Sequence, residues 1–213
     1  MDEMCLEMCK ITRWERGYRL ILDHVDFSVH KKEKVLIRGK IQEDIRQMFL
    51  VASGVTAAQE GTCRISRAGI IPEQFPDLER MRAMDYLLLP LLTQGYERKQ
   101  AWEQIKPVVK ASTLWEKRMI YVKNFTAYEK VVLLSIAALS TEPEILLAGD
   151  GISKMTEEER KKYGTWISGR LADSGMAFAA FGNLWEDILC FDRICEIQNG
   201  HLLEIHNTRE EKG

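Results

Sequence analysis

The sequence lacks the features that mark several common classes of protein. Its formal net charge is only -2, so no basic excess favours binding to nucleic acid or to an anionic membrane surface. No apolar run reaches the roughly 18 residues of a transmembrane helix, and the acidic start, Met1–Met4, is unlike a secretory signal. Neither an internal repeat nor a low-complexity linker is present. The 213 residues, of which 46% are hydrophobic and 29% charged, therefore predict one globular domain.

Paired cysteines are also lacking. The five cysteines are odd in number and scattered along the chain. Cys5 and Cys9 have the spacing of half a metal site, but no second pair with matching histidines exists. We expect reduced, cytoplasmic thiols that pack as small hydrophobic side chains.

The hydrophobic pattern predicts an α/β chain with an antiparallel opening and a helical insertion. Strands are expected at 3–12 and 18–29, joined by a turn around 15–17, and then at 35–37, 62–65, 68–71, 145–148 and 176–181. A final hairpin is expected at 193–198 and 201–206, around Asn199-Gly200. The first helix is expected after the strand at 35–37 and runs to about residue 52. Asp85 is expected to cap a second helix that contains 86–92. Further helices are expected at 96–110, 114–119, 127–139, 156–174 and 184–191. Thr126 with Glu129 has the pattern of a capping box.

The most informative segment runs from Val35 to Ala52. An apolar strand leads through Gly39 into a helix, which is the setting of the phosphate-binding loop G-x-x-x-x-G-K-S/T. Counted from Gly39, the second glycine is Asp44, the lysine is Ile45 and the hydroxyl residue is Arg46. A triphosphate needs converging backbone N–H groups, a cation and a hydroxyl for Mg²⁺. The frame of the loop is present, and its reactive groups are replaced.

Two carboxylates, Glu43 and Asp44, stand at the entrance to this helix. A phosphate held about 5 Å from one of them would meet a repulsion of roughly 3 kcal/mol at an effective dielectric constant near 20. The positive end of a helix attracts a carboxylate as readily as a phosphate. Our hypothesis is that Glu43 or Asp44 caps its own helix and fills the pocket. The alternative, an acidic first turn on an ordinary helix, predicts the same loss of ATP binding.

The order and spacing of these segments resemble the ATPase subunit of an ABC transporter. Among such subunits, the chain is most similar to those that serve lipoprotein-release, macrolide-export and cell-division type permeases. The resemblance covers about 4–204 and is carried by 22–29, 35–54, 89–91 with 98–101, 125–129 at the signature L-S-G-G-E/Q, 142–148, and 192–194 with 199–202. It implies a P-loop NTPase-like α/β fold with an antiparallel N-terminal β subdomain, a parallel core sheet and a helical subdomain. The expected organisation is a single domain, 1–213, with 1–77 and 143–206 as core, about 78–140 as helical subdomain and 207–213 as tail.

The resemblance also assigns the catalytic positions of the family. The magnesium-binding aspartate falls on Gly149 and the general-base glutamate on Asp150; a slip of one residue would make Asp150 the ligand and leave Gly151 as base. The sensing glutamine falls on Glu73, with Gln74 beside it, and the switch histidine falls near Asn183. No register supplies both the ligand and the base.

Two further positions concern nucleotide contacts. Trp14 falls where an aromatic ring stacks on adenine, although a core or edge tryptophan is an equal alternative. Thr126 keeps the hydroxyl of the signature, which in this family serves the partner subunit's ATP. Ala127 and Tyr128 replace its two glycines, and Tyr128 would crowd a phosphate unless its ring turns away.

The resemblance and the replaced residues together predict a pseudo-ATPase that binds or regulates a membrane permease or an active ABC ATPase, as a homodimer or heterodimer. We expect no catalytic residue, metal, cofactor or nucleic acid, and a cytoplasmic location at the inner face of the membrane. A surface segment at 75–82 corresponds to the groove that receives the permease. There are two alternatives. One is a weak or unusual ATPase that drives export, in which Lys40 or Arg46 replaces the lysine. The other is a regulatory protein unconnected with transport. The vestigial positions are Asp150, Glu73 and Asn183 for catalysis, and Trp14, Gly39, Asp44, Ile45, Arg46 and Thr126 for the ATP pocket.

Overall fold

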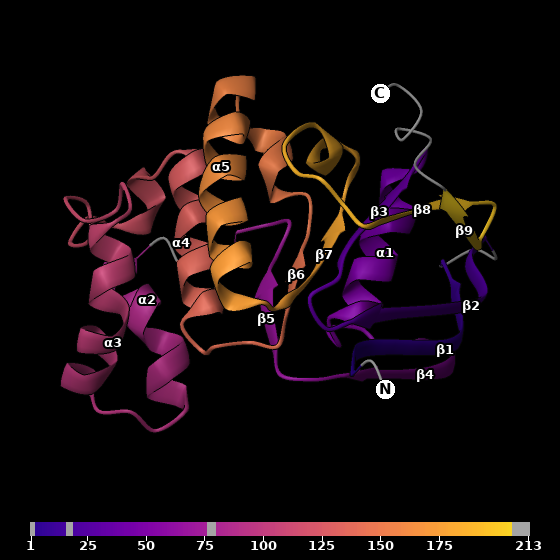
Figure 1. Cartoon of the computed structure of the whole chain (residues 1–213), viewed down its shortest axis with the longest axis horizontal. Coiled ribbons are helices and arrows are strands. Elements are labelled where there is room, and N and C mark those ends of the chain that lie inside the picture. Colours follow the sequence, from indigo (N-terminus) through magenta and orange to yellow (C-terminus); the bar gives the residue numbers. More distant parts are fainter. Residues whose placement is uncertain (1–2, 16–18, 76–79, 206–213) are drawn as a thin grey trace.

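Two β-sheets and five α-helices form the computed structural model, which describes residues 3–15, 19–75 and 80–205 (Figure 1). The smaller sheet is antiparallel and has the order β2-β1-β4. Residues 16 and 17 of the expected turn at 15–17 lie outside the described residues, as does the whole of the expected tail, 207–213. The three strands of this sheet are β1 (Met4–Trp14), β2 (Leu20–His30) and β4 (Glu60–Ile65).

The larger sheet has the order β5-β6-β7-β3-β8-β9, in which only the last pair is antiparallel. Successive side chains along its strands point to opposite faces of the sheet, and both faces are buried. Leu36 faces one apolar cluster with α4 and α5, whereas Val35 and Ile37 face another with α1 and the antiparallel sheet. The strands are β3 (Lys34–Gly39), β5 (Ala68–Ile71), β6 (Ile145–Ala148), β7 (Ala177–Phe181), β8 (Arg193–Gln198) and β9 (His201–Ile205).

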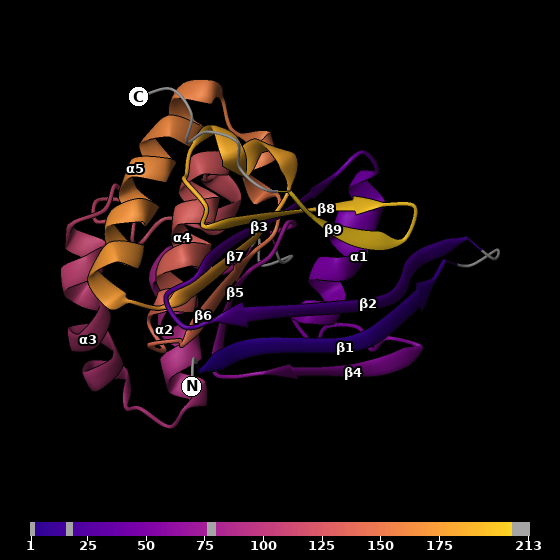
Figure 2. The ribbon, with the colours of Figure 1, turned by 45° about the vertical axis from the view of Figure 1, so that its right-hand side comes forward.

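The helices divide between these two faces. Helix α1 (Gln42–Ala52) lies between the core sheet and the antiparallel sheet (Figure 2). Helices α4 (Ala127–Leu139) and α5 (Glu157–Ser174) cover the opposite face, and α2 (Ala83–Thr93) and α3 (Arg98–Lys110) pack on α4 at the far end of the molecule (Figure 1). The predicted fold, with an antiparallel sheet, a parallel core and helices, is therefore confirmed. No helix in the described ranges is both long and apolar enough to cross a membrane.

Local signals predict the structure correctly where the stabilising contacts are local. The hydroxyl oxygens of Thr126 and Thr156 each accept a hydrogen bond from the N–H three residues later. In return, the backbone N–H of each threonine donates to the side chain of the glutamate at that position. Asn199 and Gly200 have φ values of 50° and 86°, as the predicted two-residue hairpin turn requires.

Three predicted helices differ from the structure. Asp85 does not cap a helix, because α2 begins earlier, at Ala83, and the Asp85 carboxylate pairs with Arg98. Residues 114–119 form turns, since the carbonyls of Arg118 and Ile120 accept hydrogen bonds from the start of α2. The segment 184–191 contains only a short 3₁₀ helix, η3 (Asn183–Asp187). Two more 3₁₀ helices are η1 (Val122–Asn124) and η2 (Gly151–Lys154).

Candidate functional site

The segment after β3 is where the sequence pattern predicts the replaced phosphate loop. Gly39 ends β3, and only Lys40 and Ile41 separate it from the first residue of α1, Gln42. The N–H of Asp44 donates to the carbonyl of Ile41 at 3.1 Å, so this amide is engaged within the helix. No residue from 39 to 46, all of them described, has a positive φ. The alternation of conformations that turns successive N–H groups toward an anion is therefore missing.

Ile45, at the position of the phosphate-binding lysine, belongs to the core. Its side chain is fully buried in the cluster between α1 and the two sheets. A β-carbon added to Gly39 would lie 3.6 Å from Ile45 Cγ1, which shows how closely Ile45 approaches the end of β3. An ammonium group at this place would enter an apolar environment rather than a polar cradle.

The two acidic residues of α1 are held by cations, and neither caps the helix. The N-cap is Ile41, which makes no side-chain cap bond. Asp44 is 6% exposed, and its Oδ1 lies 2.7 Å from Arg19 Nη1, on the N-terminal hairpin. Glu43 pairs with Arg46 at 2.9 Å and accepts a hydrogen bond from Gln47 at 2.6 Å. The capping hypothesis is wrong because charged donors offer stronger hydrogen bonds than the helix amides.

Two positions that the resemblance linked to magnesium and hydrolysis, Glu73 and Asp150, lie close to α1. Arg46 Nε is 3.8 Å from Glu73 Oε2, and Gln42 Nε2 donates to Asp150 Oδ2 at 3.1 Å. The positive charge of the Arg46 guanidinium therefore lies beside Glu73. With Gly149 at the aspartate position, the residues present do not match the donor set of a magnesium-bound triphosphate.

Asp150 is nevertheless an unusual carboxyl group. It is buried, and its Oδ1 has no hydrogen-bond partner among the described residues. Burial, and secondarily the charge of Glu73, raise the pKa of Asp150 to about 6, against the hydrogen bond from Gln42 and the charge of Arg160. Gly182 lies against this carboxyl group, where a β-carbon would come within 2.8 Å of Oδ1.

Asn183 joins the end of β3 to the segment after β7. Its Nδ2 donates to the Gly39 carbonyl at 3.0 Å, and its Oδ1 accepts from the Gly39 N–H at 3.1 Å. Arg38, beside Gly39, pairs with Glu186 of η3 at 2.5 Å and with Glu196 at 3.4 Å. These contacts fix the loop to two neighbouring segments, and no local pattern in the sequence indicates them.

Trp14 lies at the end of β1, with 43% of its surface exposed. Its backbone N–H and carbonyl bond to the side chain of Gln59 at 3.3 and 3.2 Å. Arg13, not Trp14, bonds to α1, through Gln47 at 3.1 Å. The described hairpin residues therefore reach α1 through arginines, and sequence reasoning misses them because the sequence does not show which strand end faces the helix.

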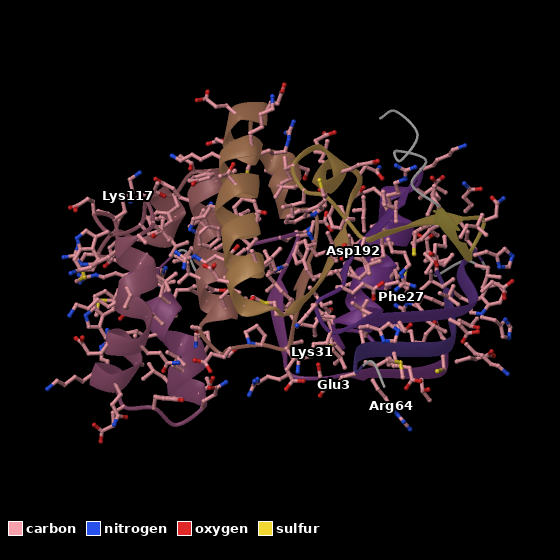
Figure 3. All side chains as sticks on the ribbon, viewed as in Figure 1. Glu3, Phe27, Lys31, Arg64, Lys117 and Asp192 are labelled. Carbon is pink, nitrogen blue, oxygen red and sulfur yellow. The ribbon has the colours of Figure 1, made fainter. Side chains whose placement is uncertain are left out.

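Thr126 lies at the other predicted nucleotide contact, the start of α4. Its Oγ1 accepts from the Glu129 N–H at 3.2 Å, and its own N–H donates to Glu129 Oε2 at 3.1 Å. Glu129 also pairs with Lys117, which Figure 3 labels at the end of the molecule far from Phe27 of β2. Tyr128 is 8% exposed and belongs to the main apolar cluster.

The groove predicted at 75–82 is only partly described, because 76–79 lie outside the described residues. Phe75 packs against Tyr86 of α2, with ring centroids 5.7 Å apart, and Lys130 of α4 lies over its ring at 5.7 Å. The described part of the segment therefore contacts the helical side of the molecule.

Comparison with known proteins gives a consistent fold. No family model matches the chain. The methionine import ATP-binding protein MetN of Clostridioides difficile (strain 630) is 24% identical over 144 residues, which are 67% of this chain and 44% of MetN. An ABC transporter ATP-binding protein of Pyrococcus abyssi (strain GE5 / Orsay) is 26% identical over 125 residues, 56% of this chain and 44% of that protein. The matches thus span less than half the length of either curated relative.

Solved structures resemble nearly the whole chain. A nucleotide-free ATP-binding cassette from an ABC transporter gives a TM-score of 0.78 at 16% identity and covers 94% of this chain and 90% of its own. The ADP conformation of MJ1267, an ATP-binding cassette of an ABC transporter, gives 0.79 at 15% identity and covers 97% and 92%. The chain has the fold of an ABC transporter ATP-binding cassette.

Proposed function

We propose that this chain is a pseudo-ATPase, a cassette-like subunit that has lost ATP binding and hydrolysis. The observation that carries the proposal is that α1 begins three residues after Gly39, so that Asp44, Ile45 and Arg46 belong to a closed helix. A phosphate loop works through free amides and a cation, and here the amide of Asp44 is engaged and Ile45 is buried. The contacts of Asp44, Arg46 and Gln42 with other parts of the chain support the proposed loss of the nucleotide.

The proposed role of such a subunit is to dock on a membrane permease or on an active ABC ATPase, at the inner face of the membrane. The fold supports this role, because cassettes of ABC transporters share it. The sequence relatives support it as well, since their names describe ATP-binding proteins for transport. Pull-down from native membranes should recover a permease or an ATPase. Recovery of neither would contradict the proposed docking role, because the fold alone does not fix the function.

A weak ATPase is the second candidate, and Arg46 is the residue that favours it. Its guanidinium lies beside Glu73, near the position of the missing cation. Glu43 and Glu73 already offset its charge, however, and Asp44 adds another carboxylate in the same turn. Lys40 is exposed and precedes the helix.

Calorimetry with millimolar MgATP separates the two candidates. We expect no heat beyond dilution, and a dissociation constant below about 100 µM would overturn the proposal in favour of the weak ATPase. A variant with Gln42→Gly, Asp44→Gly, Ile45→Lys and Arg46→Ser restores the residue types of the loop and serves as the comparison. Because its lysine replaces the buried Ile45, its urea unfolding is measured first to establish that it folds. Binding by this variant alone would assign the loss of affinity to these four side chains.

A further inference from the structure

Positive charge is concentrated in the helical part of the chain. The segment 80–140 contains ten lysines and arginines against five aspartates and glutamates, whereas the whole chain has 30 against 32. The small net charge of the protein therefore results from two regions of opposite sign. The connection between α3 and α4, residues 111–126, carries part of the positive charge at the end of the molecule where Figure 3 labels Lys117. Uneven charge of this kind is typical of a surface that meets an anionic partner.

Three consecutive apolar side chains are exposed in this connection. Met119, Ile120 and Tyr121 are 50%, 42% and 43% exposed, whereas Val122, the next residue, is buried. The other exposed large hydrophobic side chains in the described ranges do not follow one another in the sequence. Single exposed apolar residues are ordinary, but a contiguous group of them indicates contact with another surface. We call Met119, Ile120 and Tyr121 the apolar tip.

The backbone of the apolar tip is fixed by the residues at the start of α2. The N–H of Ala83 donates to the carbonyl of Ile120 at 3.0 Å, and the N–H of Val122 donates to the carbonyl of Met81 at 3.0 Å. Both neighbours of Tyr121 are therefore hydrogen-bonded to another segment. Because the backbone is already positioned, the tip needs little ordering when it binds a surface.

Three cations lie beside the apolar tip. Arg82 lies over the ring of Tyr121, 5.8 Å from its centre, and Lys123 is exposed two residues after the tip. Arg118, immediately before the tip, lies 4.3 Å from the ring centre of Trp115. None of the three cations forms an ion pair with a carboxylate of the described residues.

The neighbouring carboxylates offset little of this positive charge. Glu129 pairs with Lys117 and Asp85 pairs with Arg98, so both are already engaged. Among the described residues of the connection, Glu116 is the carboxylate that remains to oppose the three cations. The surface around the apolar tip is therefore positive.

The shape of this surface distinguishes between two kinds of anionic partner. An amphipathic helix of a protein docks into a groove. The cavities of about 750, 350 and 170 Å³ are all lined by residues other than the apolar tip. A lipid bilayer takes up exposed apolar side chains without a groove, and its anionic headgroups attract the cations around them.

We propose that the apolar tip, together with Arg82, Arg118 and Lys123, is a contact surface for an anionic lipid bilayer. The aliphatic side chains of the tip enter the boundary between headgroups and acyl chains, and the Tyr121 ring lies at the level of the headgroups. The cations lie against the lipid phosphates. This contact is made with lipid itself, so it is independent of the pseudo-ATPase proposal and of any permease.

The test is sedimentation of the full chain with lipid vesicles. Vesicles made of equal parts of phosphatidylglycerol and phosphatidylcholine should bind the chain, and vesicles of phosphatidylcholine alone should bind it at least about tenfold more weakly. Added salt should weaken binding to the anionic vesicles, because it screens the attraction between exposed charges. Equal binding to both kinds of vesicle would overturn the proposal. Binding to neither would also overturn it and would favour an acidic protein segment as the occupant.

Two pairs of variants locate the binding on this surface. Ile120→Ser should weaken binding to the anionic vesicles by about tenfold, whereas Val55→Ser, at an exposed apolar side chain beyond the end of α1, should leave it unchanged. Lys123→Gln should weaken it by roughly fivefold, whereas Arg64→Gln, at the exposed arginine of β4 labelled in Figure 3, should not. All four side chains are exposed, so the thermal unfolding of each variant should match that of the parent chain. An affinity unchanged by Ile120→Ser or by Lys123→Gln would overturn the proposal.

Discussion

The N-termini of α1 and α4 differ in the residues that stabilise them. Each is a helix N-terminus at a position where the cassette resemblance puts a nucleotide phosphate. At α4, Thr126 and Glu129 satisfy the helix within one turn. At α1, Ile41 offers no cap, and the side chains of the first turns engage Arg19, Glu73 and Asp150 from distant parts of the chain.

The difference shows what each end contributes. The start of α4 is capped by its own residues, and within the described ranges its one ion pair with another segment is that of Glu129 with Lys117. The start of α1 joins the antiparallel sheet, the strand ends of the core sheet and the segment after β7, so its side chains hold the layers together. Placing a charge at the buried Ile45 of α1 should therefore cost more than removing the local cap of α4.

The largest effect is expected from Ile45→Lys. The side chain is fully buried, and a lysine there would place an ammonium in an apolar cluster without a carboxylate partner. We expect a loss of about 3 kcal/mol or more in the free energy of unfolding, measured with urea. Ile41→Lys, at a side chain that is 50% exposed, is the matched control and should change stability by less than about 0.5 kcal/mol. A similar cost for both variants would contradict the closed α1 start.

Asp150→Asn should raise stability, and the gain should depend on pH. Because the pKa of Asp150 is raised to about 6, the folded protein binds this proton more tightly than the unfolded chain. The Asp150 carboxyl group therefore hardly destabilises the protein near pH 4. The free energy of unfolding falls as the pH rises from about 4 to about 6. The variant should gain about 2 kcal/mol at pH 7 and nearly nothing at pH 4. The same urea series with Asp173→Asn, at an exposed position on α5, should show no such pH dependence.

Asp44→Asn tests the connection between the hairpin and α1. The loss of the ion pair with Arg19 should cost about 1 kcal/mol, since Asp44 is buried while Arg19 is partly exposed. A double-mutant cycle with Arg19→Gln should give a coupling energy that accounts for most of this loss in stability. Glu43→Gln, at a partly exposed side chain, should cost less. Zero coupling would mean that the pair does not hold the hairpin to the helix.

The smallest effects sharpen the comparison by their opposite signs. Thr126→Ala removes the cap of α4 and should cost about 1 kcal/mol. Ile41→Ser supplies a cap that α1 lacks, at an extended N-cap residue, and should add about 0.5 kcal/mol. Thermal denaturation of both variants checks the signs. A loss at Ile41 as large as that at Thr126 would show that the α1 start does not accept a local cap.

Features that depend on neighbours in the chain could be predicted from the amino-acid sequence alone. The buried strands followed from their composition, the starts of α4 and α5 from Thr126 and Thr156, and the last turn from Asn199 and Gly200. The absence of lysine at Ile45 was equally visible. These signals work because caps, turns and apolar runs involve residues only a few positions apart.

The contacts that residues near the starts of α1 and α4 make with distant segments became visible only in the folded chain. The pairing of Asp44 with Arg19, the two bonds from Asn183 to Gly39 and the packing of Tyr128 in the main apolar cluster all join segments far apart in sequence. Parallel strands bring their carboxyl ends to one edge of the sheet, and this edge sets which side chains meet there. The sequence names the candidates for such contacts, but the choice among them rests on topology, because the energy of a charge pair depends on distance and burial rather than on order along the chain.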